Sequence, residues 1–392
     1  MLFRSIFYAY QYILRVMPSI VLEDIMHQFG ISAAVLGQLS GVYYVGYSLM
    51  HLPVGILLDR YGPRNVMTGC ILLTSLGMLP LVFSTHWAYP MIGRFLIGVG
   101  SSAAILGVFK IIRMTFSEKR FPRMLSFSVM IGLIGAIYGG GPVSYMREML
   151  GYDAVVKLIA LGGVALAIIT YWVVPKVETT SSTTVLSDVK EVLSNKKVIL
   201  SCFFAGLMVG PLEGFADIWG TSFLKQVYGL DAAVAASLPS LIFIGMCFGS
   251  PLLSFIAEKM GSYLGALVGS GIIMMVGFIA LLSTSLSISL VTVNFVIIGI
   301  CCAYQILAVY KASTYVREEV AGLTTAIANM IIMPFGYLFH AAMGGVIDLM
   351  GGSAAPNAYS AAVSVIPLAL LVGSIGFFRL LIQERKEKKA VA

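Results

Sequence analysis

Charged residues are scarce in this chain. Asp, Glu, Lys and Arg together make up 11% of its 392 residues, and hydrophobic residues make up 59%, whereas about a quarter of the residues of a soluble domain are charged. A soluble protein of this composition would expose large apolar patches and aggregate, but a lipid bilayer accommodates an apolar surface on every helix. The scarcity of charge therefore excludes an ordinary soluble protein and predicts an integral membrane protein.

The chain also lacks the signatures of metal, redox and enzyme sites. Its five cysteines lie in apolar stretches without CxxC or Cys/His spacing, so we interpret them as small core residues and predict no metal site. The loops contain no nucleotide-binding motif and no Ser/His/Asp set, so neither a cofactor nor enzymatic activity is expected. No Asn-x-Ser/Thr sequon occurs, which fits a bacterial cytoplasmic (inner) membrane.

Long apolar runs are abundant. A helix needs about 20 residues to cross the hydrocarbon core, and twelve such runs can be found. The expected spans are residues 3–24, 34–58, 66–84, 89–116, 124–145 and 155–174, then 199–221, 234–257, 264–284, 288–315, 320–346 and 361–381. The first run is not interpreted as a cleaved signal peptide, because Arg15 interrupts it and no small-residue cleavage site follows.

These runs predict an all-α membrane protein of 12 transmembrane helices in two pseudo-symmetric six-helix halves. The expected halves are residues 1–174 and 199–392, the second with a short basic tail, and the polar residues 175–198 form a connector. If the N-terminus is cytoplasmic, eighteen Lys and Arg fall on the cytoplasmic side and three on the outer side. Because short cytoplasmic loops carry such an excess, both termini and the connector are expected in the cytoplasm. Basic residues sorted by loop in this way do not indicate a nucleic-acid partner.

An internal repeat supports two related halves. The segment ILGVFK at 105–110 recurs as ILAVYK at 306–311, an offset of 201 residues, and DRYG at 59–62 recurs as EKMG at 258–261, an offset of 199. Apolar matches alone would mean little, but each half repeats an intramembrane lysine and an acid-base-x-Gly turn. Parallel halves related by an axis along the membrane normal are a known transporter design.

Two motifs resemble signatures of the major facilitator superfamily. The segment GILLDRYGPR at 55–64 is similar to the superfamily's loop between helices two and three, although Asn65 stands where the fuller pattern has another basic residue. Arg94 followed four residues later by Gly98 resembles a second signature, in helix four. The resemblance covers the whole chain and implies the twelve-helix fold and a transport function. A finer resemblance, through RVMPS at 15–19, Lys110 and residues 210–220, is to a bacterial branch related to lysosomal dipeptide carriers.

The loop motif is expected to act as a conformational latch. Asp59 ends a helix at the cytoplasmic surface, where it can face the positive end of a neighbouring helix or pair with a basic residue, and Gly62 permits a tight turn. Such a contact can hold one side closed in one state and break in the other. The latch residues are Gly55, Asp59, Arg60, Gly62 and Arg64; a solvated loop with a topogenic role is the alternative.

Ionisable groups inside membrane helices are costly and require a partner, a wet cavity or a function. Arg15 lies near the middle of the first span, on one helical stripe with Tyr8 and Tyr12. Its guanidinium can make two parallel hydrogen bonds to a carboxylate, so we expect these three residues to bind substrate. A structural ion pair between Arg15 and an acid of another helix is the alternative.

Lys110 and Lys311 are repeat-related, and the resemblance places their helices, four and ten, around a central cavity. We expect both to bind substrate, with Tyr304 on the same face as Lys311. The alternative is that both side chains extend to the cytoplasmic interface.

Glu213 and Asp217 are four residues apart, so they share a face of the seventh span beside Pro211. Two buried carboxylates so close do not both ionise readily unless a nearby cation balances their charge. Glu213 and Asp217 are therefore candidates for proton coupling, and Glu213 is also a candidate for substrate binding. The alternative places Asp217 at the outer interface and leaves Glu213 as a partner of Arg15.

Arg94 is assigned to proton coupling through the superfamily signature, or to hydrogen bonds with backbone carbonyls of a neighbour. Tyr43, Tyr44 and Tyr47 are expected mainly to pack.

Three cations and two acids around one cavity favour a small anionic or zwitterionic organic solute. The leading hypothesis is secondary active transport of a carboxylate, amino acid or small peptide by alternating access, with H⁺ as a candidate coupling ion. A proton-driven multidrug antiporter is the first alternative, opposed by the cavity cations. A non-transporting membrane receptor or assembly factor is the second, opposed by the absence of a soluble domain. The expected partners are the solute and the lipid bilayer, with the chain as a monomer.

Overall fold

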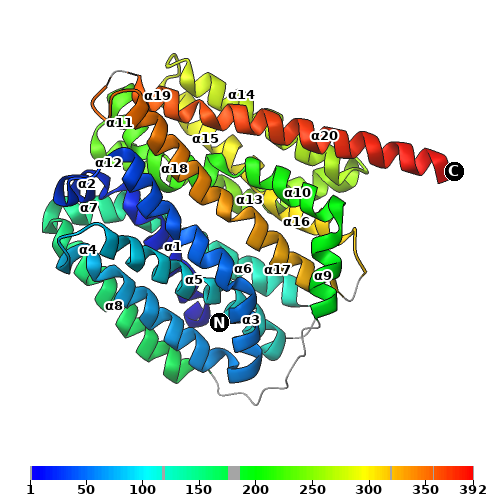
Figure 1. Ribbon diagram of the computed structural model, residues 1–392, viewed down its shortest axis with the longest axis horizontal. Coiled ribbons are helices and arrows are strands. Elements are labelled where there is room, and N and C mark those ends of the chain that lie inside the picture. Colours follow the sequence, from blue (N-terminus) through cyan, green and yellow to red (C-terminus); the bar gives the residue numbers. More distant parts are fainter. Residues whose placement is uncertain (1, 117–119, 175–185, 318–319, 356, 392) are drawn as a thin grey trace.

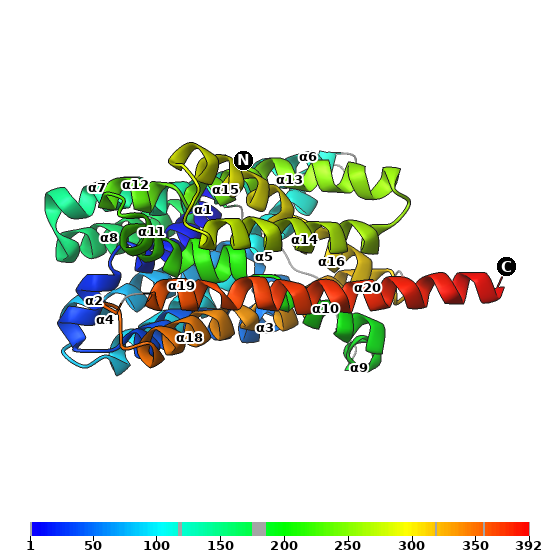
Figure 2. The ribbon, with the colours of Figure 1, turned by 90° about the horizontal axis from the view of Figure 1, so that it is seen from above.

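The computed structural model describes all residues except 1, 117–119, 175–185, 318–319, 356 and 392. The described residues form helices and connecting loops and contain no strand. Figure 1 shows the long helices running side by side, and Figures 1 and 2 both show the last helix projecting beyond the others at its C-terminal end.

The helices of the N-terminal half alternate between long spans and short elements at their ends. They are α1 (Leu2–Val16), η1 (Met17–Ser19), α2 (Leu22–Phe29), α3 (Ala33–Met78), α4 (Pro80–Phe83), α5 (Ala88–Thr115), α6 (Phe121–Gly139), α7 (Gly141–Leu150) and α8 (Tyr152–Val173).

The connector region and the C-terminal half follow the same plan. Their helices are α9 (Leu186–Ser194), α10 (Lys196–Leu207), η3 (Gly210–Trp219), α11 (Gly220–Tyr228), α12 (Ala232–Ser237), α13 (Ser240–Lys259), α14 (Tyr263–Leu282), α15 (Ile288–Cys302), α16 (Tyr304–Ser313), α17 (Ala321–Ile332), α18 (Pro334–Leu349), α19 (Ala358–Val363) and α20 (Val365–Val391).

Ten helical segments of the described chain are long and apolar enough to cross a membrane. The first of them, Ala33–Phe83, has 51 residues and holds two spans, because Gly62 interrupts α3 with φ 76° and ψ 160°. The shorter α1, followed directly by η1, forms the twelfth span. This confirms the predicted all-α fold.

The repeat is visible in the backbone. Gly62 and Gly261, which the sequence repeat aligns, both have positive φ, 76° and 62°. A residue with a Cβ adopts this left-handed conformation only with strain, so glycine is needed at both turns. The half boundaries at 1–174, 175–198 and 199–392 stay a prediction. Residues 175–185 of the connector lie outside the described residues, and α9 forms part of the remainder.

The two halves meet along two helix pairs, α3 with α18 and α6 with α13. The first pair is closely packed, since a Cβ on Gly37 would collide with the backbone carbonyl of His340. Small residues allow such approach between membrane helices. The contact brings the start of α3 to the end of α18, which we name the Asp348 end of the molecule. The opposite end, with Asp59, is named the Asp59 end.

Candidate functional site

The seventh span is not a regular α-helix at its centre. Residues Gly210–Trp219 form the π-helix η3, which has Pro211 in its first turn and is buried throughout. Because π-helical hydrogen bonds join residues five apart, side chains four and five apart lie close to one face, and such segments are rare and concentrate at functional sites. Glu213 and Asp217, both with 0% exposure, therefore project together toward the N-terminal half.

Arg15 forms ion pairs with both of these carboxylates. Its Nε donates a hydrogen bond of 2.6 Å to Oδ2 of Asp217, and its guanidinium forms an ion pair with the Glu213 carboxylate. Arg15 is 7% exposed. A buried charge without a partner would be strongly destabilising, so this three-residue cluster joins α1 of one half to η3 of the other.

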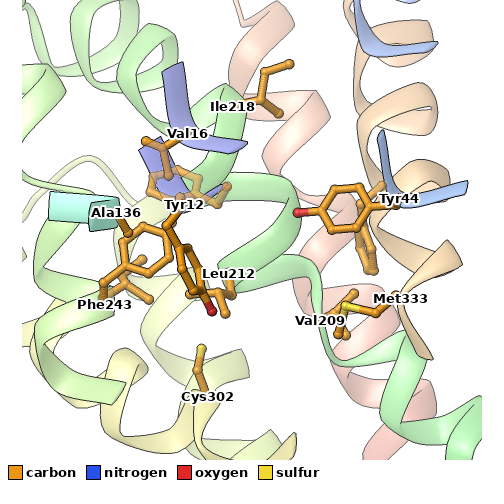
Figure 3. Close-up of a cluster of buried hydrophobic side chains, with 14 of the residues drawn as sticks. Tyr12, Val16, Tyr44, Ala136, Val209, Leu212, Ile218, Phe243, Cys302 and Met333 are labelled. Atoms are coloured by element: carbon orange, nitrogen blue, oxygen red, sulfur yellow. The ribbon is translucent and has the colours of Figure 1, made fainter. Parts of the chain in front are cut away.

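Tyr44 of α3 completes the cluster. Its hydroxyl donates to Oε2 of Glu213 at 3.0 Å and also hydrogen-bonds with Asp217. Figure 3 shows the Tyr44 hydroxyl directed at the ribbon that carries Leu212. A phenol has a single proton to donate, so it can serve only one carboxylate at a time. With one carboxyl protonated, the same oxygen could accept from that acid and donate to the other.

Two further groups fix Glu213. Gln305 Nε2 of α16 donates to Oε1 of Glu213 at 3.3 Å, and Nε2 of His340 lies 2.6 Å from the Glu213 backbone oxygen. The carboxylate of Glu213 is thus contacted from α1, α3 and α16, that is, from both halves.

A cavity of about 270 Å³ opens beside Arg15 and Glu213. Its polar lining residues are Tyr8, Tyr12, Arg15, Tyr47, Glu213, Gln305, Thr325 and Asn329. Its apolar lining residues are Ile105, Phe109, Leu125, Val129, Leu133, Leu212, Met246, Ile306, Val309 and Met333. The lining comes from both halves, so the cavity lies at the interface between them.

The cavity leads toward the Asp59 end. A second space of about 380 Å³ shares Phe109 and Thr325 with it and is lined by Asp59 and Lys110 of one half and by Gly322 of the other. The Asp348 end is instead held together, since Asp348 accepts hydrogen bonds of 3.1 Å from the backbone N–H groups of Ala33 and Ala34. Lys225 and Glu23 form another ion pair between the halves there, at 2.6 Å.

Residues 4–341 match the family described as Major Facilitator Superfamily, which is most of the chain. The chain belongs to the Major Facilitator Superfamily. This confirms the family resemblance of its two motifs, and the superfamily consists of transporters rather than enzymes. The finer resemblance to dipeptide carriers stays a prediction.

Individual relatives in the superfamily are distant. The nitrite extrusion protein of Bacillus subtilis is 22% identical over 345 residues, covering 82% of this chain and 80% of that protein. The 4-hydroxybenzoate transporter PcaK of Pseudomonas aeruginosa is 26% identical over 149 residues, covering 38% of this chain and 33% of PcaK. The chain spans about a third of the length of PcaK and of other curated relatives that it matches.

Solved structures share the superfamily fold. The crystal structure of the nucleoside transporter NupG has a TM-score of 0.80 and 14% identity, and the match covers 96% of this chain and 98% of that one. At this identity the likeness establishes the fold alone.

The cavity between the halves contains four of the residues predicted to bind substrate. Tyr8, Tyr12, Arg15 and Glu213 all line it. The Tyr8 and Tyr12 rings meet edge to face with centroids 5.2 Å apart, and the Arg15 guanidinium carbon is 5.1 Å from the Tyr12 ring centroid. The single stripe expected from their spacing is therefore present. Whether they bind substrate remains a prediction.

Three other predicted residues lie behind the lining. Tyr304 is fully buried and donates to the Ala205 carbonyl at 2.7 Å. Asp217 is buried against Arg15 rather than at the outer interface. Arg94 donates to the carbonyl oxygens of Leu14 at 2.7 Å and Ser40 at 3.3 Å, which is the arrangement of the backbone-bonding alternative.

The repeat-related lysines do not line the cavity in this conformation. Lys110 Nζ is 2.6 Å from Oδ1 of Asp59, and Lys311 Nζ is 2.7 Å from Oε1 of Glu384. Each lysine is thus paired at the Asp59 end, within its own half, because the stem extends toward the helix terminus. This geometry fits the interface alternative, and their role as ligands stays a prediction.

The latch residues gather around the same end. Asp59 pairs with Lys110, Gly62 forms the break in α3, and Gly55 lines the space between the halves. Arg64 stacks on the Tyr171 ring of α8 at 4.0 Å, and Arg60 lies 5.4 Å from the Tyr61 ring. The motif is therefore anchored to α5 and α8 of its own half, and its latch function stays a prediction.

Several site residues carry little signal in the sequence. Gln305 carries an uncharged amide, which is a weaker signal inside a span than a charge. Tyr44 is one of three neighbouring tyrosines, and nothing in the sequence indicates which of them faces the acids. Asp348 ends an apolar run, and only its position opposite Ala33 gives it a role.

Proposed function

We propose that the protein is a secondary active transporter that moves a small organic anion or zwitterion by alternating access. One observation carries the proposal: a guanidinium stands at the inner end of a cavity between the two halves, held by carboxylates of the opposite half. Arginine is suited to this task because its planar fork matches a carboxylate.

The two acids have different roles in this proposal. Asp217 is buried behind Arg15 and holds its Nε, so it positions the guanidinium. Glu213 lines the cavity, so its carboxylate can be exchanged for that of a substrate. A substrate amine, if present, would then find the displaced Glu213 beside it.

Charge balance connects this exchange to a proton. Arg15 and Arg94 offset Glu213 and Asp217 in the buried cluster, and a bound monoanion would leave an uncompensated negative charge. A proton on Glu213 removes it, and the Tyr44 hydroxyl can accommodate either protonation state. We therefore propose H⁺ as the coupling ion, with Glu213 as the titrating group, Asp217 as its partner and Arg94 as a fixed neighbouring charge.

The orientation follows from the loops. With its excess of Lys and Arg, the Asp59 end is proposed to face the cytoplasm of a bacterial inner membrane, with both termini on that side. The cavity then opens inward, and the contacts of Asp348 and Lys225 close the outer side. Residues 1–174 and 199–392 would rock against each other about the site, as two parallel repeats do in this design.

Uptake into proteoliposomes tests the proposal. A panel of labelled carboxylates, amino acids and dipeptides is assayed with an inward proton gradient, using the wild-type chain and the Arg15→Ala and Glu213→Gln variants. Loss of uptake in Arg15→Ala and loss of proton dependence in Glu213→Gln are expected. Full uptake by both variants would remove these residues from the mechanism. Resistance of an overexpressing strain to cationic drugs, with no carboxylate uptake, would favour drug efflux instead.

A further inference from the structure

The lining of the cavity changes from charged at its inner end, beside Arg15, to mainly apolar toward its mouth. α1 and α6 run parallel, since Ser5 Oγ donates to Ser128 Oγ at 2.9 Å, Gly132 packs against Tyr8 and Gly139 packs against Ile13. Arg15 is seven residues beyond Tyr8, so the charged cluster lies about 10 Å deeper than this level at 1.5 Å per residue. The mouth-side wall is therefore built by residues of α6 at and before the level of Gly132.

That mouth-side wall is apolar on three helices. On α6, Leu125, Val129 and Leu133 repeat every four residues, so they form one continuous stripe about 12 Å long. Ile105 and Phe109 of α5 continue it.

The remaining sides differ. Ile306 and Val309 of α16 add to the apolar surface, whereas polar groups come from Thr325 and Asn329 of α17, from Gln305 beside Glu213, and from the tyrosines Tyr8, Tyr12 and Tyr47, which also present their rings. A solute whose charged head is at Arg15 must therefore place its body mainly against hydrocarbon.

From this gradient we infer that the substrate is a monocarboxylate with an apolar body of about six carbons, rather than a polyhydroxylated acid or a solute with a distal amine. The inference rests on the proposed carboxylate site at Arg15 and extends it to the rest of the solute. The cavity of about 270 Å³ is smaller than the range of roughly 300–1,000 Å³ usual for drug-sized ligands. Burying an apolar chain along the stripe is favourable, whereas hydroxyls or an ammonium placed there lose hydrogen bonds to water without replacement.

Four six-carbon probes test separately the need for the carboxylate charge, the cost of hydroxyls and the cost of a distal amine. They are hexanoate; gluconate, which has a hydroxyl on each carbon except that of the carboxylate; 6-aminohexanoate, which has a distal ammonium; and hexanamide, which lacks the negative charge. Binding is measured as the ligand-dependent rise of the unfolding temperature of the purified full-length protein in nanodiscs. We expect hexanoate to bind at least about tenfold more tightly than each of the other three, since each unpaired buried polar group weakens binding by roughly this factor or more.

Two variants locate the selectivity. Val129→Thr places a hydroxyl in the apolar stripe with little change of shape and should reduce the preference for hexanoate over gluconate several-fold. Ile134→Thr, on the same helix but 58% exposed on the outer surface, is the matched control and should leave the preference unchanged.

The outcomes distinguish the inference from the proposed function. If gluconate binds as tightly as hexanoate and Arg15→Ala abolishes both, the apolar body is wrong and the carboxylate site stands. If hexanamide matches hexanoate and Arg15→Ala changes neither, the carboxylate site fails and the inference fails with it. No stabilisation by hexanoate up to its solubility would also overturn the inference.

Discussion

Asp348 at the end of α18 accepts a hydrogen bond of 3.1 Å from the backbone N–H of Ala33 at the start of α3. The second carboxylate oxygen accepts from Ala34 at the same distance. The carboxylate of one half therefore caps a helix of the other half, where the positive end of the helix dipole favours an anion. This contact can exist only while the Asp348 end is closed, so it biases the equilibrium between the two states.

Asp348→Asn is expected to populate the state open at the Asp348 end. The lost charge-dipole interaction is worth about 0.3–2 kcal/mol, which corresponds to a shift of roughly two- to thirtyfold in the equilibrium. Spin-label distances between α2 and α11 measure it. Asp153→Asn removes an acid that pairs within a single helix, with Lys157 at 2.5 Å, and should not change these distances. Unaltered distances in Asp348→Asn would show that the cap does not stabilise closure.

The two acids of η3 should differ in their effect on stability. Asp217→Asn removes the buried partner of Arg15 Nε, and breaking a buried ion pair costs about 3–5 kcal/mol. Glu213→Gln borders the cavity and keeps a carbonyl oxygen that can still accept hydrogen bonds from Tyr44 and Gln305, so it should cost less, about 1–3 kcal/mol. Unfolding in detergent measures both. Equal losses of stability would mean that Glu213 contributes as much to the folded structure as Asp217 does.

Tyr44→Phe should destabilise the protein by about 1–3 kcal/mol, because it removes a hydrogen-bond donor from two buried carboxylates. It should also alter the dependence of uptake on external pH, since the hydroxyl contacts both acids. Tyr47→Phe, in the same helix and lining the same cavity, is the control. The role of Tyr44 is contradicted if both variants retain wild-type stability and pH dependence.

Gly62→Ala is expected to lower stability by about 1–2 kcal/mol, because alanine is strained at φ 76°. Gly261→Ala should lower it similarly, since the repeat gives that residue φ 62°. Gly55→Ala belongs to the same motif, but a Cβ there meets open space, so its stability should stay within experimental error. Thermal unfolding of the three variants makes the comparison. A tolerated Gly62→Ala would indicate that the turn adopts another conformation.

Lys110→Met tests whether this lysine is a ligand. Its ion pair with Asp59 is about one-third exposed, 31% and 34% for the two side chains, and such pairs contribute roughly 0–1 kcal/mol. We expect an unchanged apparent affinity for substrate and an altered rate of transport, because Lys110 touches the latch motif and not the cavity. Lys311→Met should behave alike. A large loss of affinity in either variant would restore these lysines to the binding site.

The membrane environment, the twelve spans and the two-half plan could all be predicted from the amino-acid sequence. These depend on composition, on runs of about 20 apolar residues and on a repeat, all of which are local or periodic properties. It also identified Arg15, Glu213 and Asp217, because a charge inside an apolar run is costly wherever the helix packs. The glycine turn at Gly62 was readable for a similar local reason.

Which of these groups contact one another depends on how the helices pack in three dimensions. Arg15 and Asp217 are 202 residues apart, and no periodicity within one helix predicts a contact between helices of opposite halves. Lys110 and Lys311 resemble Arg15 in the sequence, since all three are cations inside apolar runs. Their long side chains and their position near the helix ends instead let them pair with Asp59 and Glu384 at the Asp59 end. The contacts of Tyr44, Gln305 and Asp348 likewise depend on how helices rotate and cross, which packing of the assembled halves sets.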